Sequence, residues 1–248
     1  MSDSKFPPEP DDNTIDLSRA REEREAREKA LAKEKAARRR AEEGPMFNLP
    51  PVIKILLFSM IGIFTVQELF LDAQSKSYLF INFGFVPISY FSISTLWLPA
   101  IVGPITYMFL HLNLFHILMN GLMMAAFGSA VERWLGSKRF LILFIGCGLI
   151  AVLCHYLYTL AFNGMGNPVI GASGAVSGLF AAALVMLKKT GTGIGAGKYG
   201  LWPFIGLWIA ISALFGLTSG EAGGSIAWVA HIGGFMAGFV FLRVMKFA

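Results

Sequence analysis

The chain has 248 residues, of which 55% are hydrophobic and 15% charged, with a formal net charge of +5 and a mean hydropathy of +0.60. This composition excludes an ordinary soluble domain and indicates several membrane-spanning helices. The first fifty residues are highly charged, so the start of the chain lacks the short basic region and apolar core of a signal peptide. We therefore expect an integral membrane protein with a charged extension.

Residues 1–48 form this charged tail, which we expect to be cytoplasmic and partly helical or disordered. Asp16 or Ser18 can cap a helix that Gly44-Pro45 would end. The apolar residues of this helix are almost all alanine, so it lacks the seam of a coiled coil and is expected to be solvated. The three arginines at 38–40 could also hold anionic lipid headgroups.

The membrane domain, residues 49–248, contains six apolar segments long enough to cross a hydrocarbon layer about 30 Å thick. These segments are 51–72, 114–131, 139–162, 171–187, 201–218 and 227–245. The stretch 73–112 is also apolar, but three prolines break any long helix in it. They are Pro87, Pro99 and Pro104. The sequence therefore predicts an all-α, polytopic membrane bundle of six helices.

Basic residues indicate how these helices are oriented. Beyond the tail they fall in three groups, Arg133/Lys138/Arg139, Lys188/Lys189/Lys198 and Arg243/Lys246, whereas the other loops hold Lys76. The positive-inside rule places the tail and all three groups in the cytoplasm. An even number of crossings must then separate the tail from residues 132–139, so the stretch 73–112 contributes no span. We expect this stretch to be a long outer loop, partly embedded and packed against protein.

Polar side chains occur where an apolar bundle should have few. Those in or beside the later spans are His111, His116, Asn120, Ser173, Ser177 and His231. Such groups are costly in a bilayer and are usually functional or hydrogen-bonded between helices. His116 and Asn120 are four residues apart, so they share one face of the second span.

Ser173 lies near the start of the fourth span, in the segment Gly171–Gly178. A serine at a helix start can offer its backbone N–H, with the positive end of the helix dipole behind it, to a developing oxyanion. A plain packing face is the alternative, because Gly174 and Gly178 have the spacing of small residues that joins membrane helices.

His231 lies near the start of the sixth span and is followed by a second stripe of small residues, Gly234 and Gly238. Two such stripes, each beside one member of a nucleophile–base pair, are what a serine–histidine dyad between touching helices requires. The packing interpretation and the catalytic one are therefore compatible.

Three other interpretations have less support. A soluble-hydrolase elbow needs a second glycine where Ala175 stands, and no strand pattern precedes it. A metal site would have His111 and His116, five residues apart, with no carboxylate or cysteine to join them. A transporter would carry inverted repeats, and we find none in the sequence. We expect no metal and no cofactor.

These motifs together resemble the rhomboid family of intramembrane serine proteases. The matching residues are His111-x4-His116-x3-Asn120, Gly171-Ala172-Ser173-Gly174 and Ala230-His231-x2-Gly234-x3-Gly238, on the second, fourth and sixth spans. Two further segments that resemble family members are Phe85-Val86-Pro87 and Glu132-Arg133-Trp134-Leu135-Gly136. The resemblance covers about residues 50–248.

The resemblance implies a six-helix rhomboid bundle with a long outer loop between its first two helices. It implies that Ser173 is the nucleophile and His231 the general base, without an acidic third member. The Ser173 N–H, His116 and Asn120 would line the oxyanion hole, and His111 would anchor the outer loop by hydrogen bonds. The residues implied to support the site structurally are His111, Gly171, Gly174, Gly234 and Gly238.

Two departures from the family pattern stand out. Ser177 occupies the place, one turn after the nucleophile, where the family often has an aromatic stacked on the base. Gly103-Pro104 occupies the place of a Trp-Arg pair that some members carry in the outer loop. They bear on the orientation of His231 and on the packing of the loop.

The implied activity is hydrolysis of peptide bonds in or near membrane-spanning segments, through an acyl-enzyme. The expected partners are transmembrane protein substrates and membrane lipids, with no nucleic acid; a homo-oligomer is left open. We expect the inner (plasma) membrane of a bacterium, cytoplasmic termini and a site that opens to the outer face. The alternative is a catalytically silent relative that binds membrane segments.

Overall fold

The computed structural model describes residues 21–31, 34, 48–90, 97–162, 168–190, 197–218 and 227–245. Its contacts divide the chain into two compact units, Met1–Asn48 and Leu49–Ala248. In the first unit residues 21–31 form an exposed helix. Ion pairs one turn apart join Arg21 to Glu25 and Arg24 to Glu28 on its surface. The expected capping residues and the arginines at 38–40 lie outside the described residues.

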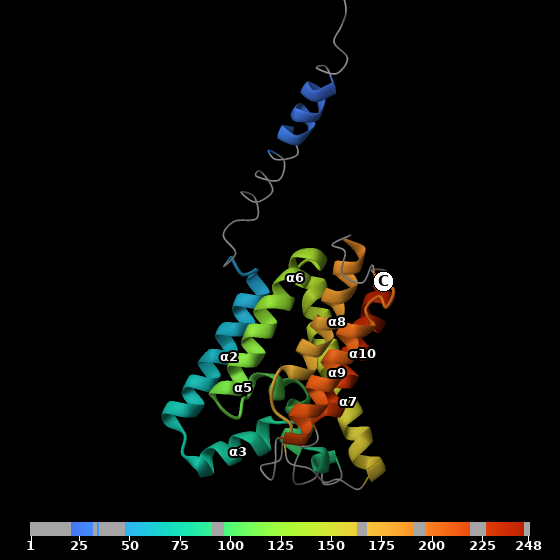
Figure 1. Ribbon diagram of the computed structural model, residues 1–248. Helices are drawn as coiled ribbons and strands as arrows, with labels where there is room; N and C mark the ends of the chain where they lie inside the picture. Colours follow the sequence, from blue (N-terminus) through green and yellow to red (C-terminus); the bar gives the residue numbers. More distant parts are fainter. Residues whose placement is uncertain are drawn as a thin grey trace, which may run out of the picture. The chain divides into compact units, whose positions relative to one another are not determined.

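The described part of the second unit is helical, with a single antiparallel bridge between Phe85 and Val169. Its elements are α2 (Pro51–Phe70), α3 (Ala73–Phe83), η1 (Pro87–Tyr90), α4 (Trp97–Thr106), η2 (Tyr107–Phe109), α5 (Leu114–Met123), η3 (Met124–Gly128), α6 (Ser129–Leu135), α7 (Ser137–Phe162), α8 (Ser173–Lys189), α9 (Trp202–Thr218) and α10 (Ala227–Val244). The long helices form a bundle, and α3 lies across the end of it opposite to α6 (Figure 1). The predicted all-α architecture is confirmed.

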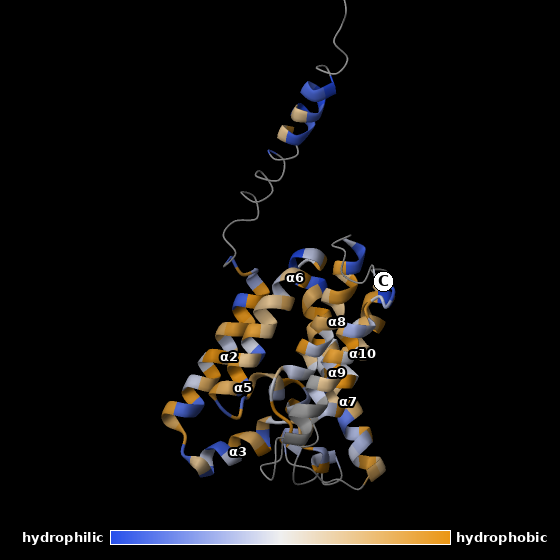
Figure 2. Cartoon of the chain, in the orientation of Figure 1, coloured by the Kyte–Doolittle hydropathy of each residue, from blue (hydrophilic) through white to orange (hydrophobic). Residues whose placement is uncertain are grey.

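Among the described residues, three stretches are long and apolar enough to cross a membrane: Pro51–Phe70, Leu114–Leu135 and Ser137–Phe162. The second is continuous through α5, η3 and α6, with η3 a π-helical turn. Figure 2 shows apolar residues along most of the bundle and polar ones toward its ends. By length and composition these three stretches are candidate spans, and the count of six stays a prediction.

The helix that departs most from a lipid-facing span is α8. It has 17 residues, and ten of them, Gly174–Leu179 and Ala181–Leu184, are buried within the protein. Small side chains suit this position because neighbouring helices, α7 and α10 above all, pack directly on its backbone. A helix enclosed by protein does not need the hydropathy that a helix in contact with lipid requires.

Within the described residues of the stretch 73–112, which are 73–90 and 97–112, the helices are short and none is long, as the prolines predict. Pro99 lies in the first turn of α4 and Pro104 in its interior, and this helix has only ten residues. Pro104 cannot donate a hydrogen bond to the carbonyl of Ala100, four residues earlier. The Tyr90 hydroxyl donates to that carbonyl instead, at 3.0 Å, which compensates for the lost helix bond.

A buried carboxylate fixes the start of α2. Pro50, which precedes the helix, provides no side-chain cap. The side chain of Glu132, from α6, accepts hydrogen bonds from the backbone N–H groups of Val52 at 3.1 Å and Ile53 at 2.9 Å. It also accepts one from the Ser137 hydroxyl at 2.7 Å. Glu132 therefore joins α2, α6 and α7 at one end of the bundle, and it satisfies N–H groups that a helix start leaves free.

Candidate active site

Ser173 and His231 are 58 residues apart in sequence and in hydrogen-bond contact in the structure. Ser173 is the first residue of α8, and His231 lies in the first turns of α10. The distance from Ser173 Oγ to His231 Nε2 is 2.7 Å, and the pair is partly buried. This contact shows that the Ser173 hydroxyl is directed to the histidine.

The close approach of α8 and α10 depends on glycines at their interface. A Cβ atom on Gly234 would collide with the backbone carbonyl of Gly174, and one on Gly238 would collide with that of Gly178. The two stripes of small residues noted in the sequence therefore face each other. Any larger side chain at these positions would separate the helices and lengthen the Ser173–His231 contact.

His116 and Asn120 approach the same site from α5. The side chain of Asn113 caps this helix by accepting from the His116 N–H at 2.9 Å. Asn120 Nδ2 donates to the His116 carbonyl at 2.9 Å. Gly171, two residues before Ser173, has φ +108° and lies against the His116 ring: a Cβ there would be 2.5 Å from His116 Nε2. These two side chains therefore lie beside the backbone that leads into α8.

Three backbone hydrogen bonds hold that approach segment in position. The Phe85 N–H donates to the Val169 carbonyl at 3.0 Å, and the Val169 N–H donates to the Phe85 carbonyl at 2.8 Å. The Gly171 N–H donates to the Tyr107 carbonyl at 2.8 Å. Tyr107 is itself fixed because its hydroxyl donates to the Gly148 carbonyl in α7, at 2.8 Å. The contacts of Phe85 and Tyr107 therefore fix the position and direction of the segment that leads to Ser173.

His111 is fully buried just before α5. Its ring contacts the His116 ring edge to face, with 5.1 Å between the centroids. Burial, and secondarily the neighbouring His116, lowers the pKa of His111 to about 3, so the ring is neutral at physiological pH. The hydrogen bond that ties this residue to the rest of the bundle is made by its carbonyl, which accepts from Gln67 Nε2 at 2.6 Å.

Ser177 is buried, and its hydroxyl donates to the carbonyl of Ser173 at 2.7 Å. The hydroxyl is therefore bonded to the backbone of its own helix. This position supplies a small polar group bonded to the backbone of Ser173, in place of the ring that the family pattern leads one to expect.

The sequence analysis did not identify Gln67 or Tyr107 as residues near the site. A signal was available for the first, since a glutamine within an otherwise apolar span is costly and usually has a specific partner. For Tyr107 there was none, because a tyrosine among the many aromatic residues of the stretch 73–112 has no distinguishing pattern.

Comparison with known proteins adds an independent observation. Residues 99–246, more than half of the chain, match the family described as the rhomboid domain. The chain belongs to the rhomboid family. The matched region contains every residue of the site described above except Phe85 and Gln67. Together with the apolar helices, membership identifies an integral membrane protein.

The chain is also similar to individual members of the rhomboid family. It is 29% identical over 130 residues to the rhomboid protease GluP of Bacillus subtilis (strain 168), and 31% identical over 144 residues to YdcA of the same organism. It is 30% identical over 81 residues to the mitochondrial presenilin-associated rhomboid-like protein of Bos taurus. The matched stretches cover 52%, 57% and 33% of this chain, and 23%, 67% and 21% of the respective relatives.

Proposed function

We propose that this protein is a serine endopeptidase that hydrolyses peptide bonds in or near the membrane-spanning segments of other membrane proteins. The observation that carries the proposal is the 2.7 Å contact between Ser173 Oγ and His231 Nε2. The protein's membership of a family that includes relatives named as proteases supports the same conclusion. No metal or cofactor is required by this chemistry.

The proposed reaction is acyl transfer to Ser173 followed by hydrolysis. The neutral imidazole of His231 accepts the hydroxyl proton through Nε2 while Oγ attacks the scissile carbonyl carbon. The same proton then goes to the leaving amine, and the C–N bond breaks to give an acyl-enzyme. Water, deprotonated by His231, attacks the ester and releases the second product together with the free Ser173 hydroxyl.

The tetrahedral intermediates carry a negative oxygen that needs hydrogen-bond donors. The Ser173 N–H, as the first of the helix, has no acceptor within α8, and His116 and Asn120 lie beside the preceding Gly171. We assign the oxyanion hole to these three donors. In a site of low dielectric, loss of one such donor typically lowers the rate by about 10²- to 10³-fold.

The proposed site opens to the outer face, where water is available. The start of α2, α6 and the end of α10 lie at one end of the bundle, and α3 lies at the other (Figure 1). The basic groups near residues 133–139 and 243 belong to the first end, and the positive-inside rule makes that end cytoplasmic. The tail and the C-terminus would then be cytoplasmic, and substrates would be transmembrane proteins that unwind near their outer ends.

Substitution of Ser173 tests the proposal. The purified protein in proteoliposomes is expected to cleave a single-span reporter and to be labelled by a fluorophosphonate, because a histidine activates the serine. Ser173→Ala should abolish labelling and lower cleavage by at least about 10³-fold. Ser77→Ala, the same change on the exposed surface of α3, serves as the matched control and should keep both activities.

Two results would contradict the proposal. Cleavage by Ser173→Ala at the wild-type rate would exclude Ser173 as the nucleophile. A wild-type protein that binds the reporter but neither cleaves it nor reacts with the fluorophosphonate would instead be the silent relative that binds membrane segments.

A further inference from the structure

Gln67 is a polar residue buried near the outer end of α2, with 1% of its surface exposed. Its Nε2 donates to the His111 carbonyl at 2.6 Å and to Glu68 Oε1 at 3.2 Å. Glu68 is in turn paired with Lys76 of α3 at 2.9 Å. Both hydrogens of the amide nitrogen therefore have acceptors, and the orientation of the amide is fixed.

The other side of the same peptide group meets His116. The His111 carbonyl and the Leu112 N–H belong to one planar peptide unit, in which the two groups point in opposite directions. The Leu112 N–H donates to His116 Nδ1 at 3.4 Å. Two hydrogen bonds thus connect Gln67 with His116 through one peptide group. Gln67 Nε2–H donates to the His111 carbonyl, and the Leu112 N–H of the same peptide donates to His116 Nδ1.

This pair of hydrogen bonds determines which nitrogen of His116 carries the proton. A neutral imidazole has one N–H and one acceptor nitrogen, and the hydrogen bond made by one nitrogen sets the state of the other. Because Nδ1 accepts from Leu112, the proton belongs on Nε2, which is the nitrogen that faces Gly171. A donor bound to the carbonyl end of a peptide also polarises its N–H, which strengthens the contact with Nδ1.

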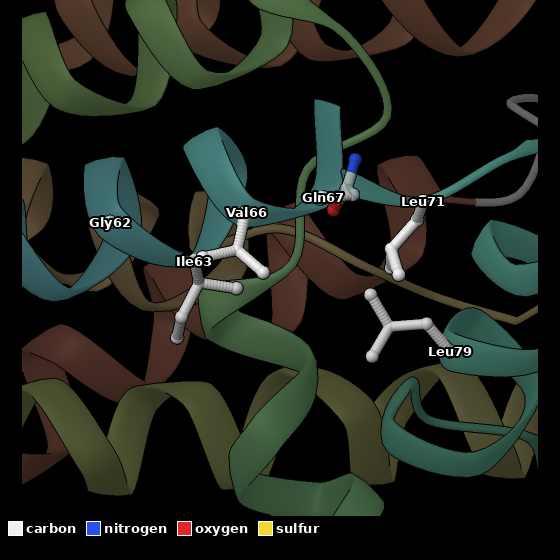
Figure 3. A pocket seen from close by; sticks show the side chains of 6 residues that line it. All are labelled: Gly62, Ile63, Val66, Gln67, Leu71 and Leu79. Carbon is white, nitrogen blue, oxygen red and sulfur yellow. The ribbon is translucent and has the colours of Figure 1, made fainter. Parts of the chain in front are cut away.

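The arrangement carries a cost that packing alone does not explain. Gln67 Oε1 is buried and has no hydrogen-bond partner among the described residues. Gln67 is the polar residue among those that line a pocket of about 240 Å³, together with Gly62, Ile63, Val66, Leu71 and Leu79. Figure 3 shows these six residues. An unsatisfied buried acceptor typically costs about 1–3 kcal/mol. A methionine or leucine would fill this place without that cost.

We infer that Gln67 is a positioning residue for the oxyanion hole: through the His111–Leu112 peptide it holds His116 in the tautomer that presents Nε2–H beside Ser173. This inference rests on the proposed function in that the donor serves catalysis. The hydrogen-bond relay itself can be tested without activity. His231 requires the opposite tautomer, with Nε2 free to accept from Ser173, so the two rings need separate control.

The tautomer can be measured directly by NMR of protein carrying ¹⁵N-labelled histidine, with His116 assigned by substitution. In the wild type, His116 should show a protonated Nε2 and an accepting Nδ1. A protonated Nδ1 in the wild type would overturn the inference, whatever the protein's activity. Gln67→Met keeps the approximate shape of the side chain and removes its hydrogen-bond donor, so it should introduce the Nδ1–H tautomer at His116. If the variant keeps the wild-type tautomer of His116, the inference is equally overturned.

Kinetics on the reporter provide the second arm. Gln67→Met should lower kcat by about 10-fold with little change in KM, less than the loss of a whole donor. If Gln67 acts through His116, Gln67→Met combined with His116→Ala should be no slower than His116→Ala alone. Losses that multiply would overturn the inference. Gln74→Met, the same change at an exposed position of α3, is the matched control for both arms.

An inactive wild type would contradict the proposed function while leaving the tautomer measurement decisive for the relay. An active wild type, with Gln67→Met unchanged in both kcat and the His116 ring signals, would contradict the relay alone. The two failures are therefore distinguishable.

Discussion

At the scale of single residues, the site depends on a few atoms that must lie within hydrogen-bond reach. The sequence indicated which residue types take part, because polar side chains in an apolar bundle are rare and costly. Gly171 shows how strict the geometry is. Its φ of +108° lies in a region that other residues rarely adopt, and the space where a side chain would begin is filled by the His116 ring.

Gly171→Ala is therefore expected to damage the site in two ways. Backbone strain should lower stability by about 1–3 kcal/mol, and the displaced His116 ring should lower kcat by about 10²-fold. Gly136→Ala is the control, since Gly136 also has a positive φ (+79°) but has nothing within 4 Å of its Cβ position. Both variants should lose stability in detergent unfolding, whereas an equal loss of kcat would contradict the steric explanation.

At the scale of elements, interactions between distant segments decide where helices begin and how closely they pack. The start of α2 is capped from α6 by Glu132, and the approach to α8 is held by backbone bonds to Phe85 and Tyr107. These contacts involve the segments around Phe85 and Glu132, which the sequence analysis noted as resembling family members. Those motifs therefore have a structural reason that lies outside the chemistry of the site.

Glu132→Gln should loosen α2. The amide provides one acceptor oxygen where the carboxylate provided two, so a buried N–H loses its charged partner, at a cost of about 1–3 kcal/mol. Unfolding in mixed micelles measures this loss. Lys76→Met breaks an ion pair at a more exposed site, for which about 0–1 kcal/mol is expected. If Glu132→Gln lowers the free energy of unfolding by less than Lys76→Met does, the cap on α2 contributes little to stability.

At the scale of the whole molecule, the proposed orientation of the bundle in the membrane rests on its basic residues. The proposed arrangement places α3 on the outside and the end of α8 in the cytoplasm, because lysines and arginines near membrane helices remain on the cytoplasmic side. This orientation decides whether the site opens to water outside the cell or within it.

Cysteines introduced at exposed positions test the orientation in intact cells. Ser77→Cys on α3 should react with a membrane-impermeant thiol reagent, and Lys188→Cys at the end of α8 should react after the cells are opened. The parent chain gives the background, since Cys147 is buried and Cys154 half-buried within α7. The reverse pattern of labelling would invert the proposed topology.

The sequence by itself determined the class of protein, the all-α architecture and the family, because apolar segments and short motifs are local properties of the chain. It also predicted which residues to examine at the site, down to Ser173 and His231. The three-dimensional structure decided what depends on segments distant in sequence. It showed the 2.7 Å contact between Ser173 and His231, and the hydrogen bond from Tyr90 that replaces the one Pro104 cannot make within α4. It also showed the hydrogen bond from Gln67 to the His111–Leu112 peptide. Such contacts come from helix packing and loop closure, which a local pattern does not encode.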